Sequence, residues 1–518
     1  MTRREHKEHK EHETESEGQP TTRSAPLRRS LGLTALGTLF PGAGLALTRR
    51  RPLGLVLLVL ALLLLVGTAW YVVSQGAESA ALSLGSRPDT LQTLGIVMAF
   101  GMLVWMASVA LTALTTRPRP MSGGQRAGLS VFTGFMCLLL AAPAAVGLRY
   151  IDAHSDAVDK IFIGRSHDQS ASTLATPDLG DEKNPWSGTP RVNLLMLGSD
   201  AGENREGVRT DSMLVASIDT QTGDAVLFGI PRNLEKVPIP ADNPLSRVWP
   251  QGYNCGDACL MNGIWTEAEA ASETNPGWYP MDPNPGLTAT QDVIGEILGL
   301  PIDYTVIVNL EGFQDLVDAM GGVDINVQER LPMGGRTTTT ADGRPMLVPG
   351  SESGYLEPGE QHLTGYQALW YARSRITTDD FSRMRRQRCV VAAVIEQVNP
   401  LTMIQRYPQV VGVAGDNVRA DISRDELPAW AELVQRVQNG SIKSLPFTVQ
   451  NTDVGDPNYT AIRARVQDAI DPPPPPTITP SPPSAEETPN PEPSPASTPE
   501  ETPPAPTEDA LEDVGVVC

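Results

Sequence analysis

The chain has no excess of basic residues. Its 518 residues include 40 Lys and Arg against 61 Asp and Glu, which gives a formal net charge of −21. Proteins that bind nucleic acid nonspecifically need a basic surface for the phosphate backbone, and no helix-turn-helix pattern is present. We therefore expect no nucleic-acid partner.

Histidine is scarce as well, with six residues in the whole chain. Beyond the stretch 149–190 only His362 remains, and it follows a Pro358-Gly359 turn motif typical of a structural position. No Gly-x-Ser-x-Gly sequence offers a serine nucleophile. These two absences argue against a Ser-His-Asp hydrolase.

Long apolar runs are concentrated in the first third of the chain. Leu53 to Val73, Leu91 to Leu114 and Leu129 to Leu148 each approach the ~20 apolar residues that a membrane-spanning helix needs. Their number excludes a single cleaved signal peptide. An earlier run, Leu31 to Leu47, is interrupted by Pro41-Gly42-Ala43-Gly44 and has arginines on both sides. We interpret it as re-entrant or interfacial and not as a fourth span.

Three spans place the N-terminus and the arginine-rich loop Arg117 to Arg126 in the cytoplasm, and everything after Arg149 outside. A fourth span would either move the N-terminus outside or expose an arginine-rich loop there. The predicted organisation is a disordered cytoplasmic tail (1–30), a membrane region (31–148), a linker (149–190), an extracytoplasmic domain (191–470) and a disordered tail rich in Pro, Ser, Thr and Glu (471–518).

The cysteines fit this topology. Cys137 lies in an apolar run, whereas the other four lie in the exported part, where disulfides persist. Cys255 and Cys259 are close enough for a local bridge, which leaves Cys389 and the terminal Cys518 as the second pair. A zinc site at Cys255 and Cys259 is the alternative, but no nearby histidine or second cysteine pair completes it.

Short apolar runs alternate with helical patterns in the exported domain. This alternation predicts an α/β fold, a three-layer α/β/α sandwich with a central mixed sheet, preceded by α-helical transmembrane segments. The expected strands are 192–197, 212–218, 225–230, 304–308 and 323–327, and the expected helices are 291–298, 312–320 and 381–398. Residues 367–371 end another short element, interpreted as the end of a strand or loop that leads into the last helix.

Arginines gather around two neighbouring motifs, Tyr371-Ala372-Arg373-Ser374-Arg375 and the stretch Asp380 to Gln387. The planar guanidinium group matches two phosphate oxygens at once. A helix that begins near Asp380 adds free backbone N–H groups and a partial positive charge. These features together predict a pyrophosphate-binding site.

Within that helix, Arg383, Arg386 and Gln387 share one face, because residues three and four positions apart are neighbours on a helix surface. A solvated basic helix is the simpler alternative. It is disfavoured because the same stripe continues into apolar residues, which indicates an inward-facing side: Val390, Val391 and Val394.

Two aspartates are the acidic counterparts of the arginines. Asp200 follows the first expected strand, and Asp211 lies in Arg209-Thr210-Asp211-Ser212 at the start of the second. Hard cations prefer oxygen ligands and commonly bridge carboxylates to phosphates. We therefore predict that Asp200 and Asp211 hold Mg²⁺ or Mn²⁺, and that Arg232, after Gly229-Ile230-Pro231, reaches the same site.

Together these motifs closely resemble those of the LytR-CpsA-Psr family of cell-wall glycopolymer ligases, of the actinobacterial type with several N-terminal transmembrane helices. The resemblance runs in the family's order from about Arg191 to Val398. The matching segments are 193–200, 209–213, 230–232, 302–304, 312–324, 358–365, 368–375 and 380–387.

The resemblance implies a Mg²⁺- or Mn²⁺-dependent phosphotransferase in the cell membrane. It would move a glycopolymer from a polyprenyl-pyrophosphate lipid carrier onto peptidoglycan and release polyprenyl phosphate, so its partners would be the lipid-linked glycan, peptidoglycan and the bilayer. Asp200 or Asp211 could also accept the proton of the attacking hydroxyl. The residues implied in pyrophosphate binding are Arg209, Arg232, Asn262, Arg373, Arg375, Arg383 and Gln387, and those implied in catalysis are Asp200, Asp211, Arg232, Arg373 and Arg375.

The sequence departs from the family at two positions. Asn233 follows Arg232 where the family has aspartate, and Leu260-Met261-Asn262 stands where the family has Lys-x-Asn, so only Asn262 is carried over. A polyprenyl pyrophosphate hydrolase, or a protein that binds polyprenyl-phosphate lipids without catalysis, therefore remains an alternative.

Overall fold

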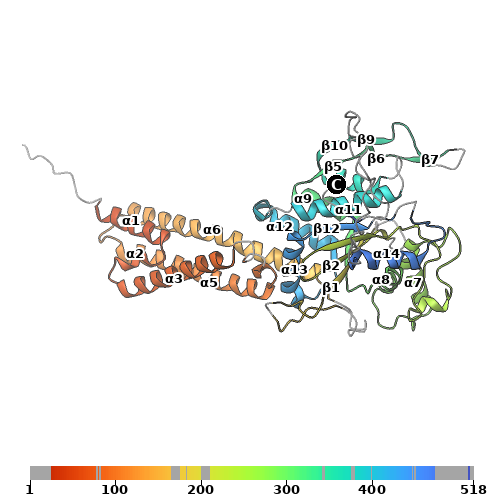
Figure 1. Cartoon of the computed structure of the whole chain (residues 1–518). Helices are drawn as coiled ribbons and strands as arrows, with labels where there is room; N and C mark the ends of the chain where they lie inside the picture. The colour runs from red at the N-terminus through yellow and green to blue at the C-terminus, as the bar shows by residue number, and fades with distance from the viewer. Residues whose placement is uncertain are drawn as a thin grey trace, which may run out of the picture. The chain divides into compact units, whose positions relative to one another are not determined.

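The structure is a computed structural model. It describes residues 25–76, 80, 83–164, 175–181, 184–199, 210–340, 345–374, 380–397, 400–445, 447, 451–472 and 511–513. The chain divides into two compact units, Met1–Ala80 with Gln92–Ile151, and Ala81–Leu91 with Asp152–Cys518 (Figure 1). Each unit is described by itself.

The first unit is helical. Among the described residues, three helices are long and apolar enough to cross a membrane, and this unit contains the first and most of the other two: α3 (Arg51–Gln75), α5 (Pro88–Thr116) and α6 (Gly123–Ile161). The broken apolar run ahead of them forms two shorter helices, α1 (Ala25–Leu39) and α2 (Ala43–Ala46). Gly42 makes the turn between these two with a positive φ of 79°, and a Cβ there would lie 2.4 Å from the carbonyl oxygen of Gly54.

The expected linker 149–190 is wrong at both of its ends. Its first residues continue helix α6 as far as Ile161. Near its other end the Trp186 side chain is fully buried and its indole N–H donates to the Ala429 carbonyl oxygen over 2.9 Å. The ring lies edge-on to Trp430. The residues around Trp186 have the composition of a linker, so the sequence did not predict that this side chain is part of the domain core.

A mixed seven-stranded sheet forms the centre of the second unit, in the order β11-β4-β1-β2-β3-β12-β13. Parallel pairs are β1 with β4 and β3 with β12, and the remaining neighbours are antiparallel. The strands are β1 (Arg191–Ser199), β2 (Thr210–Asp219), β3 (Ala225–Gly229), β4 (Tyr304–Asn309), β11 (Val418–Ala420), β12 (Ile442–Leu445) and β13 (Glu512–Asp513).

Helices cover both faces of this sheet, which confirms the predicted three-layer α/β/α sandwich. Leu195 and Leu197 of β1 join a core with α7 (Ile264–Thr274), α8 (Pro285–Leu298) and α14 (Tyr459–Ile470). Val192 of β1 joins a second core with α13 (Leu427–Asn439). Successive side chains of a strand point to opposite faces, so this alternation separates the two cores. Figure 1 shows α7, α8 and α14 together on one side of β1 and β2.

A third core lies in a lobe beside the sheet. It is built from helices α9, α10 and α11 and short strands, with Val317, Leu363 and Val390 among its buried residues. The bounds are α9 (Leu310–Met320), β5 (Val323–Val327), β6 (Leu331–Gly334), β7 (Thr337–Thr339), β8 (Pro345–Leu347), β9 (Glu352–Leu356), β10 (Gly359–Leu363), α10 (Gly365–Arg373), α11 (Asp380–Gln397), α12 (Pro400–Asn417) and η3 (Arg424–Glu426).

The cysteine predictions have two outcomes. Cys255 and Cys259 form the predicted local disulfide, with 5.2 Å between their Cα atoms. Cys389 is buried on α11 and is disulfide-bonded. Its predicted partner, Cys518, lies outside the described residues.

One part of the expected disordered tail has a defined place. Of residues 473–518 the structure describes 511–513, and Glu512 and Asp513 form β13 beside β12. Leu511 packs against the core on the α8 side of the sheet. The tail therefore adds an edge strand, which its composition did not predict.

A buried carboxyl group links α8 to the segment before α7, which contains η1 (Pro244–Arg247) and η2 (Met261–Gly263). The Oδ2 atom of Asp292 accepts a hydrogen bond from Asn243 Nδ2 over 2.8 Å, and Asn243 Oδ1 accepts one from the Tyr279 hydroxyl over 3.0 Å. Burial raises the pKa of Asp292 to about 6, against the lowering effect of the Asn243 hydrogen bond and with further raising by Asp242 and Asp282.

This pKa predicts how stability depends on pH. Because the folded-state pKa of Asp292 exceeds the ordinary value, its contribution to stability is present in acid and is lost as pH rises through about 6. We expect Asp292→Asn to raise the free energy of unfolding at pH 7.5 by up to about 3 kcal/mol and to leave it unchanged at pH 3.5. Urea denaturation of the chain in detergent at both pH values measures this. The exposed Asp425→Asn is the control, and an Asp292→Asn effect of the same size at both pH values would contradict the assignment.

Candidate active site at the carboxyl end of the sheet

Strand polarity brings several chain segments to one end of the sheet. Ser199, the last residue of β1, pairs with Asn309 at the end of β4 and with Thr210 at the start of β2. Near the start of β2, Leu214 pairs with Gly229, the last residue of β3. Ligands of α/β proteins bind outside the carboxyl ends of strands. We call this region the carboxyl end of the sheet.

Arg232 lies at this end, three residues after β3. The chain beyond β3 is fixed by a hydrogen bond of 2.9 Å from the Ile230 N–H to the Met213 carbonyl oxygen. The Arg232 carbonyl oxygen in turn accepts a bond of 3.0 Å from the N–H of Asn262, which lies in η2. The two predicted site residues Arg232 and Asn262 are therefore neighbours.

Helix α11 packs against the same end of the sheet. A Cβ built on Gly229 would lie 3.3 Å from the Met384 Cε atom and 3.5 Å from a guanidinium nitrogen of Arg388. Arg383, Arg386 and Arg388 are each at most 4% exposed. Burial of a charge is costly unless polar partners compensate it. The three buried guanidinium groups, which lie within six residues, therefore require hydrogen-bond acceptors or anions close to this helix.

Arg386 was interpreted as part of the phosphate-facing stripe, and the structure corrects this. Its Nε atom donates to the Tyr371 carbonyl oxygen over 2.8 Å, and a terminal nitrogen donates to the Ser374 carbonyl oxygen. The other terminal nitrogen forms an ion pair of 3.0 Å with Glu329. Arg386 therefore clamps the end of α10 to α11. The spacing of the arginines could not separate this role from phosphate binding.

The clamp brings the predicted residues Arg373 and Gln387 to this connection. Arg373 is the last residue of α10, and its guanidinium carbon lies 5.9 Å from the centre of the Trp370 ring. The Gln387 side-chain amide donates to the Ala372 carbonyl oxygen over 3.4 Å. The predicted site residues that the structure describes therefore come from four regions: the segment after β3, η2, the end of α10 and the first half of α11.

The remaining predicted residues cannot be placed. Asp200, Arg209 and Arg375 lie outside the described residues. The backbone of Asp211 belongs to β2, but its side chain is not described. In the sequence Asp200 follows Ser199 and Asp211 follows Thr210, and the paired residues Ser199 and Thr210 lie at the carboxyl end of the sheet. Among the described residues, no group of three His, Cys, Asp or Glu side chains could hold a metal ion.

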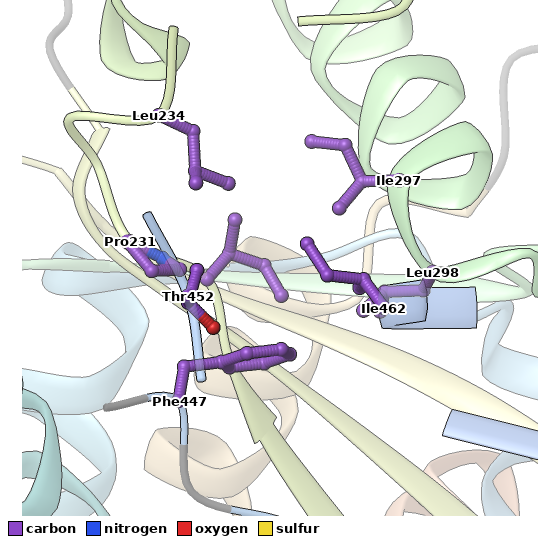
Figure 2. A pocket seen from close by; sticks show the side chains of 8 residues that line it. Pro231, Leu234, Ile297, Leu298, Phe447, Thr452 and Ile462 are labelled. Carbon is purple, nitrogen blue, oxygen red and sulfur yellow. The ribbon is translucent and has the colours of Figure 1, made fainter. Parts of the chain in front are cut away.

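A narrow apolar hollow, which does not admit a sphere the size of a water molecule, lies next to Pro231, the residue before Arg232. Figure 2 shows its side chains, which come from the end of β3, from α8 and α14 and from the segment after β12. The lining residues are Ile230, Pro231, Leu234, Ile297, Leu298, Phe447, Thr452 and Ile462. The hollow was not predicted residue by residue, because its walls come from segments far apart in the sequence.

His362 takes no part in this site. It lies on β10, where its Nδ1 atom is 2.7 Å from Asp324 and its Nε2 atom is 2.8 Å from the Gly321 carbonyl oxygen at the end of α9. The hydrogen bond to Asp324 raises the pKa of His362. These contacts connect β5, β10 and α9, as expected for a structural residue.

The fold and the site define an α/β protein with a cationic centre next to an apolar hollow, an arrangement suited to a ligand with an anionic head and an apolar tail. The model of the LytR_cpsA_psr family matches residues 162–470. This match spans more than half of the chain, so the protein belongs to the LytR_cpsA_psr family.

Two relatives illustrate the sequence similarity. The polyisoprenyl-teichoic acid–peptidoglycan teichoic acid transferase TagU of Enterococcus faecalis is 24% identical over 329 residues, which cover 62% of this chain and 88% of the relative. The enzyme of the same name from Halalkalibacterium halodurans is 27% identical over 326 residues, 59% of this chain and 89% of the relative.

Solved structures are similar over about half of the chain. The crystal structure of Bacillus subtilis TagV is 22% identical, covers 54% of this chain and 97% of its own, and has a TM-score of 0.36. The protein gbs0355 from Streptococcus agalactiae is 20% identical, covers 55% and 89%, and has a TM-score of 0.40. Family membership rests on the family match and not on these scores.

The Arg386 clamp predicts a graded response to substitution. We expect Arg386→Lys to lower the free energy of unfolding by about 2–3 kcal/mol, because one ammonium group cannot reach three acceptors on different segments. Glu329→Gln should cost less than about 1 kcal/mol, since Glu329 is partly exposed and both backbone contacts survive. Denaturation of the chain in detergent measures both changes, with Arg385→Lys as the neighbouring control. Equal losses in Arg386→Lys and Arg385→Lys would contradict the clamp.

Proposed function

We propose that this protein is a phosphotransferase that moves a glycopolymer from a polyprenyl-pyrophosphate carrier onto peptidoglycan and releases polyprenyl phosphate. The observation that carries the proposal is that Arg232 and helix α11, with its buried Arg383, meet at the carboxyl end of the sheet, next to the apolar hollow. A polyprenyl pyrophosphate has the two parts that such a site accommodates. The names of the relatives, which are teichoic acid transferases, agree with this chemistry.

In this proposal the arginines hold the pyrophosphate. Guanidinium groups bind phosphate oxygens in pairs, and the free N–H groups at the start of α11 add positive potential. Charge on the phosphoryl oxygens increases in the transition state, so fixed cations stabilise it more than they stabilise the substrate. The residues assigned to this task are Arg209, Arg232, Asn262, Arg373, Arg375, Arg383 and Gln387.

The hollow takes the first part of the polyprenyl chain. All but one of its lining residues are apolar, and Pro231 directly precedes Arg232, so the tail and the pyrophosphate would meet at the end of β3. The hollow in this structure is too narrow for a polyprenyl chain. Binding would therefore have to separate α8 and α14 from the segment that follows β3.

The reaction exchanges one bond to phosphorus for another. A hydroxyl oxygen of peptidoglycan attacks the phosphorus that bears the glycan, and the bond from this phosphorus to the bridging oxygen breaks. Polyprenyl phosphate leaves with the bonding electrons, and the hydroxyl proton passes to a carboxylate, either Asp200 or Asp211. The acceptor must lie outside the membrane, which requires the catalytic domain to be extracytoplasmic and α3, α5 and α6 to span the bilayer.

Asp200 and Asp211 would hold Mg²⁺ or Mn²⁺. The adjacent ends of β1 and β2 from which they come fit such a site, because two carboxylates beside a pyrophosphate offer the oxygen ligands that these ions prefer. The bound ion would neutralise charge on the phosphate oxygens.

A protein that binds polyprenyl-phosphate lipids without transferring their glycan is the second candidate. It is favoured by Asn233 and Leu260, which stand where the family has aspartate and lysine. A hydrolase that uses water as the acceptor is a related possibility. The transferase attaches the glycan and releases polyprenyl phosphate, the hydrolase releases polyprenyl phosphate without attaching the glycan, and the binding protein does neither. One assay therefore distinguishes the three.

That assay combines the chain in detergent with a polyprenyl-pyrophosphate-linked glycan, peptidoglycan and Mg²⁺, and follows polyprenyl phosphate release and glycan attachment together. We expect coupled release and attachment, reduced about 100-fold or more in Arg373→Ala because a charge-stabilising donor is lost. The exposed Arg406→Ala on α12 should retain the native rate. Release without attachment would indicate the hydrolase, and binding without turnover would indicate the lipid-binding protein.

The metal assignment has its own test. We expect a chelator to abolish transfer, and Mg²⁺ or Mn²⁺ to restore it. Asp211→Asn should raise the metal concentration needed for half-maximal rate by about tenfold or more, because a carboxylate ligand is replaced by a neutral amide. Titration of the transfer rate with Mg²⁺ measures this, and Asp425→Asn on η3 is the control. Full activity in the presence of the chelator would refute the metal site.

A further inference from the structure

We propose that the outer face of helix α10 is a sugar-binding subsite for the glycan carried by the lipid pyrophosphate. The inference rests on the proposed function and assigns a task to residues Tyr366 and Trp370, which the pyrophosphate site does not use.

Tyr366, Trp370 and Arg373 form one continuous stripe on α10. Their spacing of four and three residues places them on one face of the helix, whereas Ala368, Leu369 and other residues of the helix are buried against the lobe. The ring centres of Tyr366 and Trp370 are 6.2 Å apart, with the rings inclined edge to face at 63°, and the Arg373 guanidinium carbon lies over the Trp370 ring, 5.9 Å from its centre. We call this stripe the aromatic ladder.

The ladder is open to a ligand at its far end. Tyr366 is 39% exposed, so part of this residue is open to solvent. Its hydroxyl lies 2.6 Å from the hydroxyl of Ser353, which is also exposed, on β9. Two exposed hydroxyl groups thus border an aromatic surface.

This combination suits a pyranose ring. The face of an aromatic ring is electron-rich and apolar, so it attracts the C–H bonds on the face of a sugar. The hydroxyl groups on the sugar's edge then need hydrogen-bond partners, which Ser353 and Tyr366 can supply. An apolar peptide would gain nothing from this hydroxyl pair.

The ladder is also held rigidly in place. The Gly365 N–H at the start of α10 donates to Asp318 of α9 over 2.7 Å, and the Thr364 side chain caps the helix in a capping box with Gln367. A Cβ on Gly365 would lie 2.0 Å from the Gln314 carbonyl oxygen, so α10 approaches α9 as closely as glycine allows. A rigid surface loses little entropy when it binds a sugar.

Continuity with the pyrophosphate site identifies the occupant as the donor glycan. The ladder ends at Arg373, which in the proposed function holds the phosphate to which the first sugar is bonded. From Tyr366 to Arg373 the helix rises about 10 Å at 1.5 Å per residue, roughly the length of a disaccharide. The first sugar would lie against Trp370, next to Arg373, and the second near Tyr366 and Ser353.

Binding of two lipids tests the subsite: bare polyprenyl pyrophosphate, and polyprenyl pyrophosphate that carries a disaccharide. With the native chain in detergent, we expect the disaccharide lipid to bind more tightly. Trp370→Ala and Tyr366→Ala should each weaken the disaccharide lipid by about fivefold to tenfold and leave the bare lipid within twofold. Trp370→Phe should retain most of the preference, because it keeps an aromatic face. Trp278→Ala, a partly buried tryptophan outside the ladder, is the control.

Three outcomes would overturn the subsite. Equal weakening of both lipids by Trp370→Ala would mean that Trp370 acts only through Arg373. Unchanged binding of the disaccharide lipid in both alanine variants would mean that the ladder does not contact the glycan. A native chain that binds bare polyprenyl pyrophosphate and gains nothing from the disaccharide would refute the subsite alone, whereas a native chain that binds neither lipid would refute the proposed function as well.

Discussion

The burial of three arginines in the first half of α11 is the constraint on which the rest of the domain depends. A guanidinium group inside a protein needs acceptors on every side, and Arg386 finds them in two backbone carbonyl groups and Glu329. These contacts fix where α10 ends relative to α11. Since Arg373 ends α10 and Arg383 lies on α11, the same contacts set the geometry of the proposed pyrophosphate site.

Sheet polarity supplies the second half of the arrangement. β1 and β3 end near the start of β2. Strand pairing therefore brings residues from distant parts of the chain together, and contacts between their side chains are not required for this. The helices on the α8 side of the sheet then close an apolar hollow directly beside Arg232. The cationic site and the apolar site are therefore adjacent because the chain passes from Pro231, which lines the hollow, directly to Arg232.

Much of this could be predicted from the sequence, because the signals are local. The strand β5 has the predicted bounds, and α9 ends at Met320, directly before Gly321 and Gly322, whose φ angles of 108° and 98° suit glycine. Alternating apolar residues identified β1 to β4, and the spacing of Cys255 and Cys259 identified their bridge. The helix α11 begins one residue before the predicted start.

What could not be predicted depends on contacts between distant segments. The role of Arg386 depends on its contacts with Glu329 and with the C-terminal end of α10. The spacing of residues within α11 does not predict these contacts. Trp186 looked like part of a linker because its neighbours are polar, yet its partner Trp430 lies far along the chain. The strand β13 follows a proline-rich stretch, and only the free edge of β12 explains its pairing.

The central claim is that one site binds a pyrophosphate and the start of an apolar tail together. Calorimetric titration of the chain with inorganic pyrophosphate, a polyprenyl monophosphate and a polyprenyl pyrophosphate of the same chain length tests it most directly. The account predicts that the polyprenyl pyrophosphate binds more tightly than either of the others, because only it fills both the cationic centre and the hollow. Equal affinity for inorganic pyrophosphate and the lipid would contradict it.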